Sequence, residues 1–286
     1  MAYPDFITDD GLLTNYYAEM ETFNEADDLL TMNDKIFRWS MWKVLSRLNR
    51  AGYQREHFDL PPGLVNAWYQ PELNSLTLPL AILGQPFYDA KWPSSLNYGS
   101  LGVIAGHELS HGFDDEGVQW DGEGFLTSWM GTNAYNSFKE MAQCIIDEYS
   151  GFKPPGMPNL SGEQTQGENI ADNGVCSLTG IHAAYRAYKN EANLRVFSRF
   201  THDQLFFIGF AQVWCERNDT KYGTLEHDLT NPHSPSIFRV LGTLQNFPAF
   251  ANAFNCPSNK AYSPTKHCTV WVSEVSDGTC KTSILI

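Results

Sequence analysis

Apolar residues recur at helical spacing along most of the chain. Within residues 11–60 they alternate with charged residues at the period of an α-helix, which predicts two helices with a break near Asn33 and an end at Gly52. Between later segments the chain is rich in turn residues, with a loop containing Gly and Pro over 151–167. Apolar patterning predicts four further helices, over about 97–112, 128–149, 167–188 and 203–215.

Two short apolar stretches predict a pair of strands. Val65–Tyr69 and Leu76–Leu80 flank a turn that contains Pro71 and Asn74. Pro79 restricts the second stretch to an edge position or a strand end, because proline cannot donate to a ladder. The predicted fold class is therefore mainly α with a small edge β-sheet (α+β).

The composition is that of a folded, acidic protein. Hydrophobic residues make up 42% and charged residues 18%, which excludes a disordered chain. Lys and Arg number 19 against 33 Asp and Glu, and a net charge of −14 repels phosphate backbones, so we expect no nucleic-acid partner. The 286 residues suffice for one large domain, expected over 1–271, followed by a tail of unknown role, 272–286.

Export signals in the sequence are few. No apolar stretch approaches the roughly 20 residues that span a bilayer, and the first ten residues lack the basic start and apolar run of a signal peptide. The six cysteines include no CxxC pair, which argues against a zinc knuckle and leaves long-range disulfides or buried thiols open. Glycosylation sequons at Asn159 and Asn218 slightly favour an exported protein.

The clearest chemical motif lies in the helix predicted over 97–112. His107-Glu108-Leu109-Ser110-His111 matches HExxH, which places two imidazoles on one helix face about 6 Å apart. Two such nitrogens can take two corners of a tetrahedral zinc, while Glu108 lies to the side and can reach a water at the metal. The alternative is a core helix with a buried histidine pair.

A catalytic zinc needs a third protein ligand. The helix predicted to start at Gly167 carries Glu168 and Asp172, again four residues apart on one face. Glu168 can ligate the metal, and Asp172 can accept a hydrogen bond from a ligand imidazole. Alone, Glu168 could equally be an acidic residue that complements the helix dipole. Combined with His107 and His111, it predicts one zinc ion per chain.

Six motifs in one order resemble the neprilysin and endothelin-converting enzyme family of zinc metallopeptidases. The resemblance extends from Tyr3 to Trp271. It implies a thermolysin-like catalytic lobe that cuts short peptides on the amino side of bulky apolar residues. The motifs are Val65–Tyr69, Ile104–Asp115, Gly167–Gly174, Gln212–Cys215, His233–Pro235 and Cys268–Trp271.

The resemblance implies roles for individual residues. Glu108 is implied as general base and later proton donor, and His233 as the donor that stabilises the oxyanion; with Asp172 they form the implied catalytic set. Arg239 is implied to hold a substrate carbonyl. Without the resemblance, His233 would be a surface residue in a Pro-rich turn and Arg239 a solvated cation. The remaining implied roles are zinc ligation by His107, His111 and Glu168, orientation of the two histidines by Asp172 and Asp114, substrate backbone binding by Asn66 and Ala67, and an apolar specificity pocket of Ile82, Phe87, Val103, Ile104, Val213 and Trp214, which would otherwise be core.

The chain also departs from that family. Members are more than twice as long, with a membrane helix and an N-terminal lobe that closes over the site. The chain would therefore lack the upstream partners of Cys215 and Cys256, and its own partners would include an N-terminal lobe or a homologous chain. Cys144 and Cys268 match a family disulfide that would close a loop of about 125 residues. The pairing of Cys176 and Cys280 stays open. An extracellular or plasma-membrane ectodomain location is implied.

Three functions compete at this point. A zinc endopeptidase acting on peptide substrates is favoured by the complete ligand set and base. A catalytically incomplete fragment or peptide-binding decoy is favoured by the absent lobe. A zinc aminopeptidase would share HExxH and a downstream Glu, but the sequence contains no Gly-x-Met-Glu-Asn-type stretch for anchoring an amine.

Overall fold

The computed structural model describes residues 5–49, 62–154, 158–174, 180–188, 199–217 and 230–271. It separates into two compact units, Met1–Pro62 and Gly63–Ile286. Predictions for Cys176, Cys280, the sequon at Asn218 and the tail over 272–286 lie outside the described residues. No helix in the described part of the chain is long and apolar enough to cross a membrane.

The first unit is helical. A 3₁₀ turn, Asp5–Thr8, precedes α1 (Asp10–Tyr16), and α2 covers Leu29–Ser46. An aspartate begins each helix, and the Asp28 carboxylate accepts a hydrogen bond of 2.8 Å from the Thr31 backbone N–H. α2 begins directly after this cap and continues without interruption through Asn33. The predicted break near Asn33 is therefore wrong. The predicted end at Gly52 lies outside the described residues.

The second unit begins with the predicted pair of strands. β1 (Trp68–Gln70) and β2 (Ser75–Thr77) form a two-stranded antiparallel sheet in which Tyr69 pairs with Leu76. Each strand is shorter than predicted, and Val65–Ala67 leads into β1 outside the ladder. Asn74 closes the turn with a positive φ of 42°, a conformation that asparagine tolerates. The small edge sheet is confirmed.

The helix predicted over 97–112 is present with changes of winding. α3 (Ser94–Asn97) continues through a π-helical turn, Tyr98–Gly102, into α4 (Val103–Ser110), and a 3₁₀ turn, His111–Phe113, follows. α8 (His202–Val213) crosses the π-helical turn closely. A Cβ at Gly99 would lie 2.1 Å from the carbonyl oxygen of Phe206, so the crossing requires glycine there.

The other helices partly match the prediction. The expected single helix over 167–188 is divided, because α6 ends at Asn173 before Gly174 and α7 begins at Gly180. α10 and α11 fall in the part predicted to be rich in turns, and that prediction is wrong. Their prolines stand at the N-cap (Pro235) and the first helical position (Pro248), where proline is tolerated. The bounds are α5 Thr132–Ser150, α6 Gln166–Asn173, α7 Gly180–Ala187, α10 Ser236–Gln245 and α11 Pro248–Phe254.

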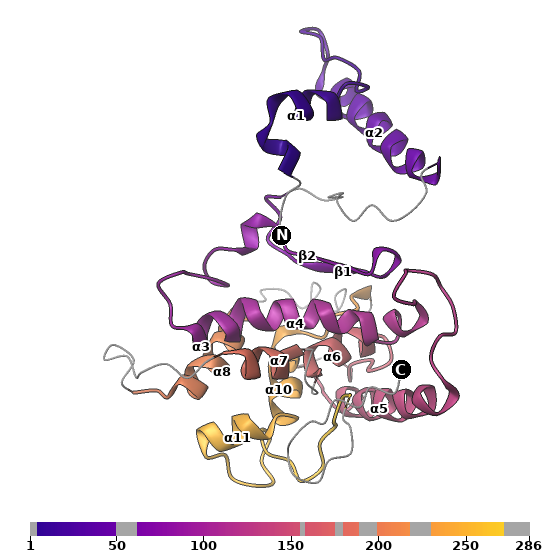
Figure 1. The fold of residues 1–286 in the computed structure, drawn as a ribbon. Helices are drawn as coiled ribbons and strands as arrows, with labels where there is room; N and C mark the ends of the chain where they lie inside the picture. The colour runs from indigo at the N-terminus through magenta and orange to yellow at the C-terminus, as the bar shows by residue number, and fades with distance from the viewer. Residues whose placement is uncertain are drawn as a thin grey trace. The chain divides into compact units, whose positions relative to one another are not determined.

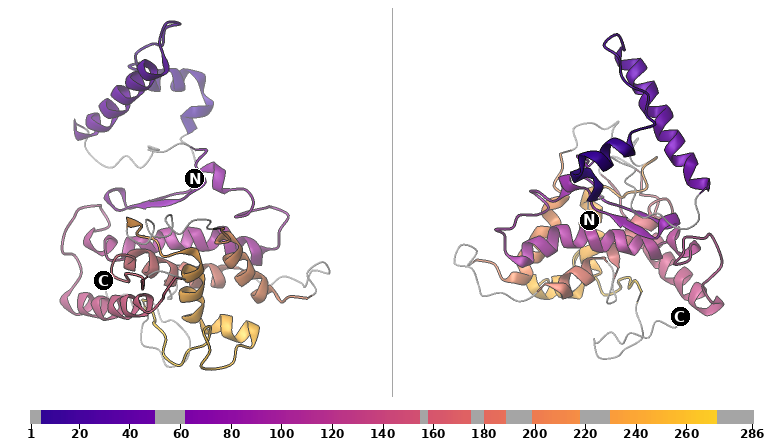
Figure 2. Two further views of the ribbon diagram at one scale, coloured as in Figure 1. Left: turned by 180° about the vertical axis from the view of Figure 1, so that it is seen from behind. Right: turned by 45° about the horizontal axis from the view of Figure 1, so that its top comes forward.

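α4 lies at the centre of the second unit (Figure 1). The β-hairpin packs on one side of α4, and α6 and α7 pack on the other, an order that is also visible in the two views of Figure 2. The mainly helical fold is therefore confirmed, and it holds α4 between a strand edge and α6.

Three apolar clusters support this arrangement. One joins Val103 of α4 to α7, α8 and α10. A second packs α5 against α6 and the segment around Val270. The third is small and lies under the hairpin, where Ala67, Ile82 and Ile104 meet with Phe87 and Trp214 at its margin. The third cluster borders the candidate site described below.

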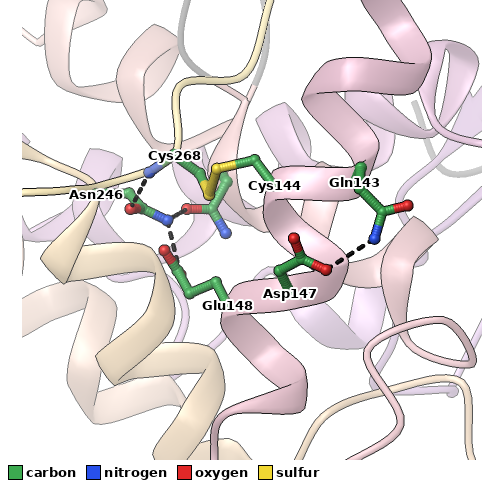
Figure 3. Close-up of a disulfide and its surroundings, with 7 residues drawn as sticks. Gln143, Cys144, Asp147, Glu148, Asn246 and Cys268 are labelled. Carbon is green, nitrogen blue, oxygen red and sulfur yellow. Dashed lines mark hydrogen bonds between the residues drawn. A yellow bond between two sulfur atoms is a disulfide. The ribbon is translucent and has the colours of Figure 1, made fainter.

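The predicted disulfide is confirmed. Cys144 of α5 is bonded to Cys268, 124 residues later (Figure 3). Asn246, which directly follows α10, accepts a hydrogen bond of 2.9 Å from the Cys268 backbone N–H and donates one of 2.9 Å to Glu148 of α5. Among the described cysteines Cys215 and Cys256 are free thiols.

Candidate metal centre

α4 and the turn after it carry two histidines that face the same point. His107 lies in α4, and His111 begins the 3₁₀ turn that continues the helical direction. Their Nε2 atoms are 3.0 Å apart, and the two rings are nearly perpendicular. The HExxH spacing thus gives the predicted convergence of two imidazoles.

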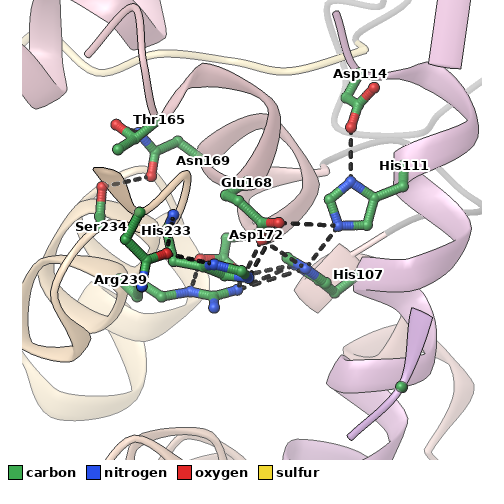
Figure 4. A network of polar contacts seen from close by, with 12 residues as sticks. His107, His111, Asp114, Thr165, Glu168, Asn169, Asp172, His233, Ser234 and Arg239 are labelled. Carbon is green, nitrogen blue, oxygen red and sulfur yellow. Dashed lines mark hydrogen bonds and ion pairs between the residues drawn. The ribbon is translucent and has the colours of Figure 1, made fainter. Parts of the chain in front are cut away.

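Glu168 of α6 completes the group (Figure 4). Its carboxylate oxygens lie 3.1 Å from His107 Nε2 and 3.7 Å from His111 Nε2. Gly167 allows this approach, because a Cβ there would lie 2.6 Å from Asp115 Oδ1. A larger residue would push α6 away from the turn that follows His111.

The donor set fits a tetrahedral metal. Ligands at about 2.05 Å from zinc are separated by roughly 3.3 Å. Here the two Nε2 atoms are 3.0 Å apart, and the nearest Glu168 oxygens lie 3.1 Å (Oε2) from His107 Nε2 and 3.7 Å (Oε1) from His111 Nε2. Glu168 Oε2 is buried and has no hydrogen-bond donor among the described residues. Glu108 also lies within 4.8 Å of the histidine donors, close enough to reach a water at the metal.

Two aspartates orient the histidines from behind. Asp172 Oδ1 is 2.8 Å from His107 Nδ1, and Asp114 Oδ2 is 2.6 Å from His111 Nδ1. Asp114 is itself fixed by the backbone N–H groups of Glu116 and Gly117, at 2.9 and 2.7 Å. In a neutral imidazole, an Nδ1–H that donates to its carboxylate leaves the Nε2 lone pair for a metal at the shared point.

Arg239 is buried against the same aspartate. Its Nε and Nη2 each donate to Asp172 at 2.7 Å, and its guanidinium stacks on the Trp214 ring at 3.9 Å. The side chain is only 6% exposed, so the alternative of a solvated cation is wrong. Arg239 and His107 therefore share Asp172.

Burial and pairing shift the pKa values of these groups. Burial raises the pKa of Glu108. Burial alone would also raise the pKa of Asp172, but Arg239 and His107 outweigh it and hold that pKa below its usual value. Burial lowers the pKa of His233. The site thus keeps Asp172 as an anion and makes Glu108 a stronger base than an exposed glutamate.

A cavity of about 440 Å³ opens beside the metal group. Its volume is that of a small-ligand pocket. Most predicted substrate-binding residues line it: Asn66, Ala67, Ile82, Phe87, Ile104, Val213, Trp214 and Arg239, together with His233. Val103 does not; it is buried in the core cluster with Phe206, because it sits on the other face of α4. His233 Nε2 lies 3.1 Å from Glu168 Oε1.

Several lining residues have no counterpart in the sequence-based prediction. Val65, Trp68 and Tyr69 line the cavity beside Asn66 and Ala67, so five consecutive residues reach it and strand alternation does not single them out. Glu116 and Gly117 line it through the turn after α4. The residue types over 114–117 predict a turn, but its approach to the cavity depends on the backbone bonds to Asp114, which no pattern signals.

Comparison with known proteins agrees with this geometry. The sequence model of peptidase family M13 matches residues 66–270. The chain belongs to peptidase family M13. It is 42% identical to neprilysin-1 of Caenorhabditis elegans over 280 residues, which cover 95% of this chain and 36% of that protein. It is 38% identical to endothelin-converting enzyme 1 of Homo sapiens, over 95% of this chain and 35% of that protein.

Solved M13-like structures share the fold. The zinc metalloprotease ZMP1 of Mycobacterium tuberculosis, in complex with an inhibitor, superposes with a TM-score of 0.75 at 32% identity, covering 86% of this chain and 38% of that one. The Haemonchus galactose-containing glycoprotein complex gives a TM-score of 0.80 at 36% identity, covering 94% and 44%. The chain spans about a third of the length of the curated relatives it matches.

Proposed function

We propose that this chain is the catalytic part of a zinc-dependent metalloendopeptidase that hydrolyses short peptides. One observation carries the proposal: His107 Nε2 lies 3.0 Å from His111 Nε2, and the Glu168 carboxylate approaches them with Oε2 at 3.1 Å and Oε1 at 3.7 Å, beside a cavity and with Glu108 next to them. Two histidines and one carboxylate with an adjacent glutamate are the donor set of zinc peptidases.

His107, His111 and Glu168 would hold one zinc ion per chain. When bound, zinc supplies Lewis acidity, which acidifies water and polarises a peptide carbonyl. The two aspartates at Nδ1 keep the histidines in the tautomer that a metal requires. Asp172 acts on the reaction through His107 and Arg239, since it is only 1% exposed.

Glu108 moves the proton. It accepts a proton from the attacking water and later delivers it to the leaving amine. Burial raises the pKa of Glu108, which brings the group nearer to the basicity that a proton shuttle needs at neutral pH. Its place beside the histidine donors puts its carboxylate within reach of that water.

The cavity walls would bind the peptide. The extended segment of Asn66 and Ala67 offers backbone groups to an extended substrate, as an edge strand does. Ile82, Phe87 and Ile104 would receive a bulky apolar side chain on the amine side of the cut bond. His233 would donate to the developing oxyanion from Nε2 when its ring is protonated, with Nδ1–H held by Asn231 Oδ1. Arg239, fixed by Asp172, would hold a substrate carbonyl.

The setting of the enzyme follows from the disulfide and the family. The Cys144–Cys268 bond favours an oxidising location, outside the cell or on an ectodomain. An N-terminal lobe or a homologous chain would complete the substrate site. A second candidate is a peptide-binding chain or decoy that holds peptides without turnover, and the cleavage experiment below separates it from the first.

Cleavage of a blocked peptide tests the proposal. The substrate carries a fluorophore and quencher at its two ends and a Phe or Leu after the central bond, so an aminopeptidase cannot cut it. Zinc-loaded wild type should cut it, and Glu108→Gln should be slower by about 100-fold or more. Zinc and peptide binding without any cleavage would favour the peptide-binding decoy.

A further inference from the structure

The loop that carries His233 is attached to α6 by the residue next to it. The His233 side chain is 44% exposed, and its Nδ1 faces Asn231 Oδ1 at 2.8 Å within the same loop. Ser234, by contrast, is 1% exposed, and its hydroxyl donates to Asn169 Oδ1 of α6 at 2.8 Å (Figure 4). The half-exposed histidine is therefore joined to a fully buried attachment point.

Asn169 is held rigidly in α6. It is fully buried, and its Nδ2 donates to Thr165 Oγ1 at 2.8 Å. The Thr165 hydroxyl in turn donates to the Ser161 carbonyl at 3.0 Å. The bond to Thr165 uses the amide nitrogen of Asn169, so the amide oxygen is fixed in direction and available to Ser234.

Two neighbouring contacts join the loop to α6, one through His233 and Glu168 and one through Ser234 and Asn169. Asn169 directly follows Glu168, whose carboxylate lies 3.1 Å from His233 Nε2, and Ser234 directly follows His233. Successive residues of a helix point about 100° apart, so Glu168 can face the metal group while Asn169 faces the loop. The loop is also bonded just before α6, where Gln164 Nε2 donates to the Asn231 carbonyl at 2.8 Å, but this bond is exposed. The Ser234–Asn169 hydrogen bond is thus the buried attachment that lies next to both His233 and Glu168.

We propose that Ser234 and Asn169 are positioning residues, whose buried hydrogen bond holds His233 where it can donate to the oxyanion of the reacting peptide. The inference rests on the proposed function, in which His233 is that donor. A bond that only stabilised the fold would lower stability without changing how the site discriminates between ligands.

The test compares two peptide inhibitors with the same apolar side chain, measured by calorimetry on the zinc-loaded full chain. A phosphonate places a charged oxygen where the oxyanion would form, and a thiol contacts only the metal. Ser234→Ala should weaken phosphonate binding by about 10- to 100-fold and change thiol binding by less than about two-fold. Asn169→Ala should have the same effect, and the double variant no greater one.

Ser95→Ala is the matched control. Ser95 is also fully buried, and its hydroxyl contacts another side chain, His202, at 3.3 Å, away from the candidate site. It should lower the melting temperature as Ser234→Ala does and leave both affinities unchanged. Should Ser234→Ala not fold, Ser234→Cys replaces it, since a thiol is a weaker donor and should give a smaller loss in the same direction.

A second readout depends neither on zinc nor on an inhibitor. In ¹³C-histidine spectra of the zinc-free chain, with the signal assigned through His233→Gln, Ser234→Ala should shift or broaden the His233 signal and Ser95→Ala should not. Unchanged phosphonate affinity together with an unchanged His233 signal would overturn the proposal. A wild type that binds both inhibitors but cuts no peptide would instead overturn the proposed function.

Discussion

Two neighbouring faces of α6 carry buried polar groups of different kinds. Glu168 and Asp172, four residues apart, share a face that meets His107 and Arg239, so this face is charged. Asn169 and Asn173 share the adjacent face and make neutral amide hydrogen bonds. The partners of this second face are Thr165, Ser234, Tyr149 and Asn246.

The two faces of α6 differ in how strongly their buried groups depend on their partners. On the charged face each ion depends on its partner, because an isolated charge is costly to bury. On the amide face each group makes ordinary hydrogen bonds whose loss costs less. The charged face can therefore contribute a metal ligand and orient His107, while the amide face fixes the helix that presents Glu168 and Asp172.

The largest effect on the free energy of unfolding should come from removing the Cys144–Cys268 disulfide, which is linked to the amide face through Asn246. Asn246 joins Asn173 to the backbone N–H of Cys268, and Cys268 is bonded to Cys144. The bond closes a loop of 124 residues, so replacing both cysteines by serine should lower the free energy of unfolding by about 5 kcal/mol. Urea denaturation measures the change. Cys215→Ser, at an exposed free thiol, should stay within about 0.5 kcal/mol, and a disulfide effect as small as that would contradict the expectation.

Breaking the charged face should cost nearly as much. Arg239→Met leaves Asp172 buried with His107 as its remaining charged partner, and the expected loss is about 3–5 kcal/mol. Arg38→Met is the control, because Arg38 is 66% exposed and pairs with Asp34 on a helix surface. If both variants shift the denaturation midpoint equally, the buried ion pair of Arg239 contributes no more to stability than an exposed pair, which would contradict the expectation.

Breaking the amide face should cost less. Asn246→Leu removes the bonds to Asn173 and Glu148 and leaves the Cys268 N–H without its acceptor, for an expected loss of about 1–3 kcal/mol. Asn252→Leu, at an exposed position of α11, serves as the control. A loss from Asn246→Leu that exceeded the loss from Arg239→Met would reverse the comparison.

The smallest effect concerns pH. Asp115 lies against Gly167 of α6, and burial, followed by the charge of Asp114, raises the pKa of Asp115 to about 6. Because this pKa is above the unfolded value, its contribution to stability is full below about pH 4 and is lost as the pH rises through about 6. Above pH 6, Asp115→Asn should stabilise the metal-free chain by about 1 kcal/mol, allowing for partial exposure. Thermal melts at pH 4.5 and 8 in a chelator measure this. A variant that is not stabilised at pH 8 would contradict the expectation.

The charged face could be predicted from local spacing. HExxH and the Glu168/Asp172 pair each place two side chains four residues apart on one helix face. Short-range periodicity is therefore sufficient to predict the metal-donor side chains. The strands at Val65–Tyr69 and Leu76–Leu80 were likewise signalled by local alternation, although their ladder is shorter than the pattern.

The amide face could not be predicted in the same way. The bonds of Asn169 to Ser234 and of Asn173 to Asn246 join residues 65 and 73 positions apart, and no periodicity links them. The same reason hides the bidentate contact of Arg239 with Asp172. The turn-rich appearance of the sequence after residue 215 hides α10 and α11, whose prolines stand at helix starts.

The most direct measurement of the central claim is the zinc content of the folded chain by native mass spectrometry. The wild type should hold one zinc ion per chain, and Glu168→Gln should lose most of it at micromolar zinc. Glu163→Gln removes the same charge at an exposed position near the start of α6 and should retain the ion. A wild type without stoichiometric zinc, or a Glu168→Gln variant that binds it as tightly as Glu163→Gln, would contradict the assignment of His107, His111 and Glu168 as the metal centre.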